Sequence, residues 1–178
     1  MTSPLAKFMI VGMKTLFAVY LGGHTPNATL EVHDIAFVTG PNIKATFPQL
    51  KKLWFGDQNH VHVDSWVDLT FVDGYEVVFG DAPSKAPSRP KLFFVNAGFY
   101  EKALFGEQHR FLFLVDGSKA EVRKRVKILL KDLMLLHVDN LVEIDLIQEI
   151  ALKDDYFLKA VAGGTTKPLV IHQVYWPI

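Results

Sequence analysis

The amino-acid sequence predicts an α+β fold of two repeated β-β-α-β(β) units, with mixed sheets, one helix per unit and a pseudo-twofold relation between the units. Three windows of eight residues carry this prediction, because each returns later in the chain in the same order. They begin at Leu16, Glu31 and His62 and return at Leu92, Glu107 and His137. The offsets are 76, 76 and 75 residues, and 11 of the 24 compared positions are identical. Unrelated positions agree at roughly one in sixteen, so the pattern indicates duplication of a supersecondary unit.

The composition limits the class of protein. Of the 178 residues, 49% are hydrophobic, which is enough for a buried core. Lys and Arg number 19, as do Asp and Glu, so no net charge attracts nucleic acid or an anionic membrane. Cysteine is absent, which excludes disulfides, thiolate nucleophiles and Cys-ligated zinc. No apolar run approaches the eighteen or so residues of a membrane span, so we expect a soluble, cytoplasmic protein.

The repeats divide the chain into five predicted segments. They are an N-terminal extension (1–12), a first repeat unit (13–79), a Pro-rich linker (80–91), a second repeat unit (92–150) and a C-terminal closing segment (151–178). The linker contains Pro83, Pro87 and Pro90, which remove backbone donors and disfavour both helix and central strand.

The first unit starts with strands at Leu16–Leu21 and Leu30–Thr39, joined by a turn. A third strand is expected from His62 onward, where polar and apolar residues alternate, and a strand-helix-strand connection in one sheet should be parallel and right-handed. The pair Asp73-Gly74 then predicts a hairpin turn. The apolar stretch at the end of the chain, from Pro168, reads as a closing strand.

One helix is expected in each unit. In the first, Asn42 can cap it, Thr46 with Gln49 forms a second capping box, and Gly56 provides a left-handed stop. In the second, Ser118 and Glu121 form the capping box. An apolar stripe at helical spacing follows: Val122, Val126, Leu129, Leu130 and Leu133. We expect the basic residues between Arg123 and Lys131 to form a solvated face and not a nucleic-acid surface.

Histidines beside carboxylates are the only residues that suggest chemistry. The repeat matches His33 with His109 and His62 with His137. Glu31 and Glu107 precede the first pair by two residues, and Asp64 and Asp139 follow the second pair by two. Residues two apart on a strand share a face, and parallel neighbouring strands begin at the same end of the sheet. We therefore expect Glu31, His33, His62 and Asp64 to converge.

A carboxylate beside an imidazole fits general acid–base catalysis or a metal site. The catalytic candidates are His33, His62 and Asp64, and the metal-ligand candidates are His60, His62 and Asp64. His60 occurs once only, because the second copy has Leu135 at that place. The alternative is a structural pair, in which a satisfied hydrogen bond fixes the strand ends. No cofactor is indicated.

Five strings in the first unit resemble the family catalogued as domain of unknown function 1543. They are YLGG from Tyr20, EVHD from Glu31, WFGD from Trp54, HVDSW from His62 and VDGY from Val72. The resemblance runs from Met13 to about Glu149 and is strongest in the first copy. The resemblance implies a fold and a bacterial, cytosolic setting, and it does not indicate which activity the protein has. The second copy departs from the family pattern, which makes it the scaffold half if a site exists.

The function most consistent with these observations is a non-catalytic module that binds a small molecule or a protein partner, since no catalytic set is complete. The alternative is a metal-assisted or acid–base hydrolase that uses the His/Asp cluster of the first repeat. A pseudo-twofold unit often descends from a dimer, so a homodimer is also expected.

Overall fold

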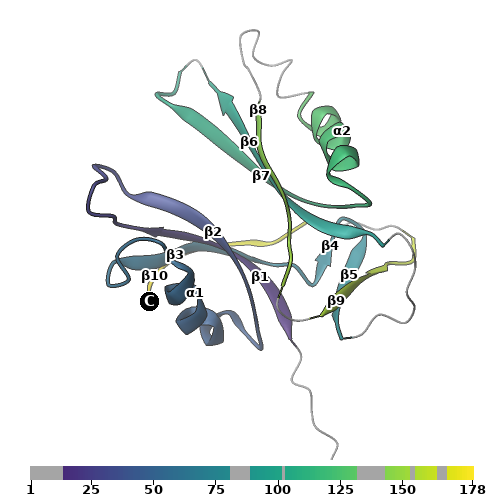
Figure 1. Ribbon diagram of the computed structural model, residues 1–178, viewed down its shortest axis with the longest axis horizontal. Coiled ribbons are helices and arrows are strands. Elements are labelled where there is room, and N and C mark those ends of the chain that lie inside the picture. The colour runs from purple at the N-terminus through teal and green to yellow at the C-terminus, as the bar shows by residue number, and fades with distance from the viewer. Residues whose placement is uncertain (1–13, 81–88, 102, 132–142, 153–154, 164–167) are drawn as a thin grey trace, which may run out of the picture. The chain divides into compact units, whose positions relative to one another are not determined.

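The computed structural model describes residues 14–80, 89–101, 103–131, 143–152, 155–163 and 168–178. The described chain is α+β and separates into two compact units (Figure 1). Unit 1 runs to Leu69 and includes Val170–Ile178, and unit 2 is Thr70–Leu169. Residues 70–79, predicted as part of the first repeat, are thus grouped with unit 2, and the last nine residues with unit 1.

Unit 1 contains a four-stranded sheet in the order β10-β3-β1-β2. Its strands are β1 (Thr15–Gly23), β2 (Val32–Gly40), β3 (Val61–Asp68) and β10 (Ile171–Pro177). Between β2 and β3 lie a short 3-10 helix, η1 (Ile43–Thr46), and α1 (Phe47–Leu53). The predicted closing strand is therefore confirmed, and it pairs with β3.

Every pairing among the described strands is antiparallel, so the prediction of mixed sheets is wrong. In unit 1 the helical connection carries the chain from one side of β1 to the other. As a result β2 and β3 do run in the same direction, as expected, but β1 lies between them and they are not neighbours. Both β2 and β3 therefore still start at the same end of the sheet.

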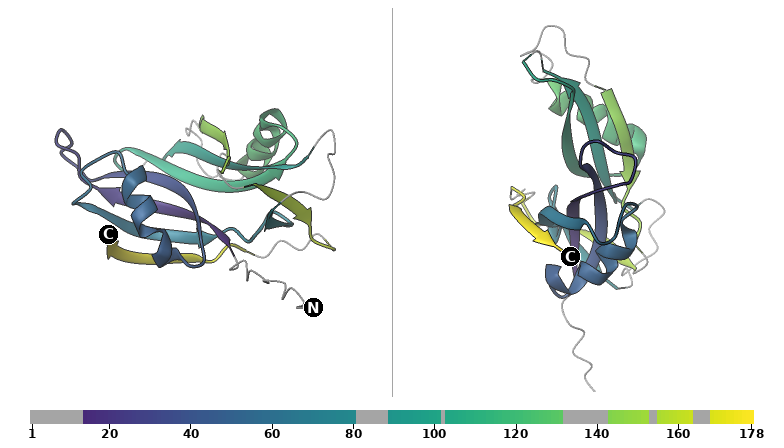
Figure 2. Two further views of the ribbon diagram at one scale, coloured as in Figure 1. Left: turned by 60° about the horizontal axis from the view of Figure 1, so that its bottom comes forward. Right: turned by 90° about the vertical axis from the view of Figure 1, so that its left-hand side faces the viewer.

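The helix of unit 1 covers one face of its sheet (Figure 2). Leu50 and Trp54 are buried with strand residues such as Val19, Val38 and Val63. Burial of this kind removes apolar surface from water and is worth roughly 1.5–3 kcal/mol for each large aliphatic side chain.

The caps of this helix differ in part from the prediction. The side chain of Asn42 accepts a hydrogen bond from the Ala45 N–H at 3.0 Å, as predicted, but it caps the 3-10 turn. Thr46 caps nothing, because its hydroxyl donates to the Ile43 carbonyl at 2.7 Å. Gly56 is not in a left-handed conformation. This position has no room for a side chain, because a Cβ there would lie 2.6 Å from the His24 carbonyl oxygen.

Unit 2 contains two three-stranded sheets, β7-β6-β8 and β4-β5-β9. The strands are β4 (Phe71–Val72), β5 (Tyr75–Phe79), β6 (Lys91–Tyr100), β7 (Glu107–Asp116), β8 (Glu143–Glu149) and β9 (Tyr156–Ala160). Its helix is α2 (Lys119–Leu129). Asp73 and Gly74 both have positive φ, 50° and 82°, which confirms the predicted hairpin turn between β4 and β5. The strand β9 was not predicted.

The helix α2 begins as predicted. The Ser118 hydroxyl accepts from the Glu121 N–H at 3.3 Å and donates to the Glu121 carboxylate at 2.8 Å. Val122, Val126 and Leu130 are buried in the core of unit 2, which confirms most of the predicted stripe. Leu129 is 52% exposed and does not belong to it. Leu133 lies outside the described residues, as do most of the predicted linker, His137 and Asp139.

Candidate functional site

The site predicted in the first repeat is assembled around Gly22. In the register of the sheet, Gly22 pairs with His33 of β2 on one side and with His62 of β3 on the other. Glu31 directly precedes β2, and Asp64 falls at the register shift of β3 opposite Tyr20 and Leu21. The β1 strand thus holds the two histidine-bearing strands on either side of a residue without a side chain.

The four side chains form an alternating cluster, which we name the His–carboxylate quartet (Glu31, His33, His62 and Asp64). His62 Nε2 lies 2.9 Å from Glu31 Oε1 and 3.1 Å from Asp64 Oδ1. His33 Nε2 lies 3.4 Å from Asp64 Oδ2 and 3.9 Å from Glu31 Oε2. Each carboxylate therefore turns one oxygen toward each imidazole, and the predicted convergence is confirmed by the geometry.

His62 is the buried member of the quartet. It is 5% exposed, whereas the His33 side chain is 35% exposed. His62 Nε2 has no hydrogen-bond partner among the described residues, although both carboxylate oxygens are within ion-pair distance. The two contacts have the distance of a hydrogen bond but not its direction. A buried polar atom without a hydrogen-bond partner is unusual, because almost all such atoms in proteins have one.

Gly22 is required by this packing. A Cβ at position 22 would lie 2.5 Å from Asp64 Oδ2 and 2.6 Å from His62 Nε2. Both distances are far inside van der Waals contact, so any other residue would displace the quartet. The double glycine at 22 and 23 lies at the end of β1 and provides this space.

Aromatic rings hold the two imidazoles. The His33 ring stacks on Tyr20, with centroids 5.1 Å apart and parallel planes. The His62 ring packs against the ring of Tyr175 in β10, with centroids 4.4 Å apart. Burial raises the pKa of Tyr20, and the nearby Asp64 carboxylate raises it further. Neither tyrosine has a sequence signal that would have placed it here, since both depend on strand pairing.

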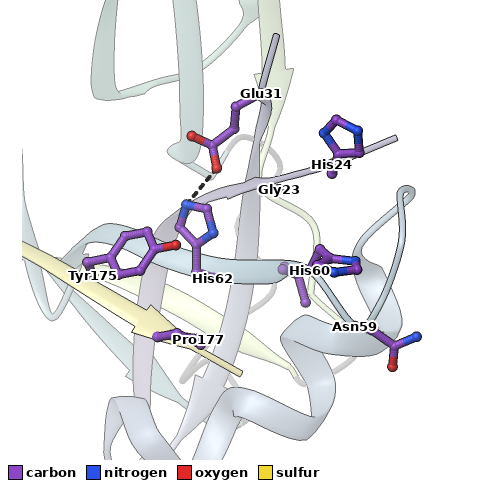
Figure 3. A pocket seen from close by; sticks show the side chains of 9 residues that line it. Gly23, His24, Glu31, Asn59, His60, His62, Tyr175 and Pro177 are labelled. Atoms are coloured by element: carbon purple, nitrogen blue, oxygen red, sulfur yellow. Dashed lines mark ion pairs between the residues drawn. The ribbon is translucent and has the colours of Figure 1, made fainter. Parts of the chain in front are cut away.

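A pocket of about 390 Å³ opens beside the quartet (Figure 3). The residues that line it are Gly23, His24, Glu31, Asn59, His60, Val61, His62, Tyr175 and Pro177. They come from the end of β1, the starts of β2 and β3, and β10. Figure 3 shows Glu31 above His62 and Tyr175 beside it, with His24, His60 and Asn59 on the other side.

His60 lies in this pocket but is held by another partner. Its Nδ1 is 2.7 Å from Asp57 Oδ2, and its side chain is 68% exposed. The Asn59 backbone N–H lowers the pKa of Asp57, and the contact with His60 lowers it further. In the described part of the chain, no group of three or more His, Cys, Asp or Glu side chains is arranged to hold a metal ion.

Unit 2 has a related cluster around Gly98. Gly98 pairs with His109 of β7 and with Glu143 of β8, and Asp145 falls at the register shift of β8. His109 Nδ1 lies 3.4 Å from Asp145 Oδ2. The strand register thus matches His62 with Glu143 rather than with His137, and Asp64 with Asp145 rather than with Asp139. The sequence does carry this signal, because VEID at 142–145 is also similar to VHVD at 61–64.

Known proteins place the chain in a family. Residues 28–79 match the family described as "Domain of Unknown Function (DUF1543)". The fold is similar to the crystal structure of protein Il1583 from Idiomarina loihiensis, with 33% sequence identity and a TM-score of 0.67. That match covers 93% of this chain and 98% of the other. The chain therefore belongs to the DUF1543 family, as its motifs indicate. No curated protein matches it, and none of its described helices has the length and apolar character of a membrane span.

Proposed function

We propose that unit 1 is a non-catalytic binding module, and that its ligand is a small molecule held in the pocket beside the quartet. The observation that carries the proposal is His62, which is 5% exposed and has an unsatisfied Nε2 at the wall of a cavity of about 390 Å³. Leaving such an atom unpaired costs about 1–3 kcal/mol. Pockets of this size with a few converging polar groups are typical ligand sites.

The duplicated origin of the two units is part of the same proposal. It is supported by the equivalent registers at Gly22 and Gly98 and by an aspartate at the register shift of both β3 and β8. In this view unit 2 is the scaffold copy, since Glu143 replaces the buried histidine. A cytoplasmic location is consistent with the absence of cysteine.

The binding proposal is tested by protein NMR with a library of soluble fragments. Fragments that bind should shift the signals of His62 and Tyr175 in the wild-type protein and lose that effect in Tyr175→Ala. The matched control is Tyr100→Ala in unit 2, because Tyr100 is a similarly exposed tyrosine of a strand. Fragments that never perturb the pocket signals would refute the proposal.

A second candidate is an acid–base hydrolase, and one observation favours it. His33 is solvent-accessible and its Nε2 faces Asp64 at 3.4 Å, which is a carboxylate-oriented imidazole of the kind that a general base requires. His62 and Asp64 would orient it. A metal-assisted form would add His60, whose ring is instead paired with Asp57.

Hydrolysis is tested with chromogenic esters and phosphate esters, using His33→Ala as the loss-of-function variant and His109→Ala as the matched control. Turnover by the wild-type protein that disappears only in His33→Ala would establish this candidate. Metal analysis of protein purified without an affinity tag tests the metal-assisted form. Metal-free protein and unfolded His33→Ala and His62→Ala variants would favour a purely structural role for the quartet.

A further inference from the structure

The charge of the pocket indicates the kind of ligand that it accepts. None of the nine lining residues is Lys or Arg. Glu31 provides a carboxylate whose side chain is 47% exposed, and Asp64 lies behind it against the same two imidazoles. The quartet therefore holds two carboxylates, each within 3.1 Å of His62 Nε2, and it contains no Lys or Arg. A cation beside Glu31 lowers the energy of this arrangement, and an anion raises it.

The size of the pocket argues against a bare metal ion. Its volume of about 390 Å³ is roughly thirteen times the share of one water molecule in the liquid, about 30 Å³. A metal ion also needs several ligand atoms at suitable positions, and no group of three or more His, Cys, Asp or Glu side chains among the described residues is arranged to hold one. An organic molecule fits both observations, because its body can occupy the volume that an ion leaves empty.

The walls of the pocket suit the two ends of such a molecule. Next to His62 in the same pocket, Tyr175 is 68% exposed and offers an aromatic face. Aromatic rings attract ammonium groups as well as apolar bodies. On the other side His24, Asn59 and His60 provide polar groups without a fixed positive charge.

We propose that the ligand class of this pocket is an organic amine, bound as an ammonium ion between the Glu31 carboxylate and the Tyr175 ring. This inference rests on the proposed binding function and adds the charge of the ligand to it. The ammonium donates hydrogen bonds to Glu31, which is the strong, charge-assisted type of contact. His62 Nε2 lies 2.9 Å from Glu31 Oε1, on the buried side of this carboxylate.

The experiment compares ligands that differ only in charge. Three series with propyl, butyl and 2-phenylethyl bodies are each tested as the amine, the alcohol and the chain-extended carboxylate. Binding is followed by NMR shifts of Tyr175 and His62. We expect each amine to bind about tenfold more tightly than its alcohol, and the carboxylate to bind most weakly.

Two variants connect the preference to Glu31. In Glu31→Gln the amine and the alcohol should bind equally, while in Glu107→Gln, the matched position of unit 2, the tenfold preference should persist. Circular dichroism checks that both variants are folded. An alcohol or carboxylate that binds at Tyr175 better than its amine would overturn the charge assignment and leave the binding function standing. If no compound of any series shifts the two signals, both proposals fail.

Discussion

The clusters around Gly22 in unit 1 and Gly98 in unit 2 differ mainly at one position. Each has a glycine on the central strand, a histidine on one neighbour and an aspartate at a register shift on the other. Unit 1 adds a buried histidine, His62, where unit 2 has the exposed Glu143. The shared residues therefore belong to the way this sheet is built, while the buried histidine distinguishes the unit with the described pocket.

The contacts of the matched histidines, His33 and His109, also differ between the two units. His33 stacks on Tyr20, an apolar ring, whereas His109 contacts the amide oxygen of Asn96 at 3.1 Å. Both histidines of the unit 1 cluster thus contact aromatic rings, whereas the matched histidine of unit 2 contacts an amide oxygen. Substitutions at matched positions should separate the two, and unit 1 can be observed alone because all three tryptophans lie in it.

The largest expected difference is at the position that distinguishes the clusters. His62→Ala should lower the free energy of unfolding by about 2–4 kcal/mol, because it leaves a cavity at a buried site. Glu143→Ala should change it by no more than about 0.5 kcal/mol, because Glu143 is exposed. Urea denaturation followed by tryptophan fluorescence and circular dichroism measures both. Equal losses in the two variants would contradict the distinction.

The central glycines should differ less. Gly22→Ala should cost about 1–3 kcal/mol, because the new methyl group meets the buried His62 and Asp64. At Gly98 the same methyl group meets the carboxylate ends of Glu107 and Asp145. These flexible ends can move into solvent, so Gly98→Ala should cost less than about 1 kcal/mol. Thermal unfolding measures the two costs. A larger drop in Tm for Gly98→Ala than for Gly22→Ala would contradict the conclusion that the glycine of unit 1 is the more tightly packed.

The helix caps should be nearly equal in the two units. Asn42→Ala and Ser118→Ala each remove one cap hydrogen bond, and each should cost about 1 kcal/mol. Native-state hydrogen exchange of the first turns of η1 and α2 localises the loss. A cost confined to Ser118→Ala would mean that the 3-10 turn of unit 1 is held by packing alone.

The last prediction concerns alkaline pH, and its variants are Tyr156→Phe in unit 2 and Tyr20→Phe in unit 1. Burial raises the pKa of Tyr156 in unit 2 to about 12, with a contribution from Glu149, and burial likewise raises that of Tyr20 in unit 1. Since the folded pKa is above the unfolded value of about 10, the neutral tyrosine stabilises the fold fully below pH 10. For Tyr156 this stability is lost as the pH rises from about 10 to 12.

Denaturation at pH 8 and pH 11 tests this dependence. The loss of stability between the two pH values should shrink in Tyr156→Phe, and by a smaller amount in Tyr20→Phe. Tyr100→Phe, at an exposed tyrosine of unit 2, is the control and should follow the wild-type protein. A Tyr156→Phe variant with the full alkaline loss would show that Tyr156 is not its source.

Family membership and the α+β class followed from the residues themselves, because motifs such as EVHD and HVDSW are local strings. The start of α2 was equally local, since Ser118 and Glu121 are three residues apart and bond to each other. One prediction failed where the local sequence allowed a second hydrogen bond for the same side chain. Thr46 matches a capping pattern, but its hydroxyl donates a hydrogen bond to the Ile43 carbonyl of the preceding 3-10 turn and does not cap the helix.

What the sequence determined by itself was the set of residues that meet at the site, because spacing of two on a strand fixes a shared face. What only the tertiary structure decided was how they meet. Strand order placed Gly22 between His33 and His62, and one register shift in each unit matched Asp64 with Asp145. The last strand brought Tyr175 against His62. These outcomes depend on pairing between segments that can be more than a hundred residues apart, and hydrogen bonds between strands leave no periodic trace in the sequence.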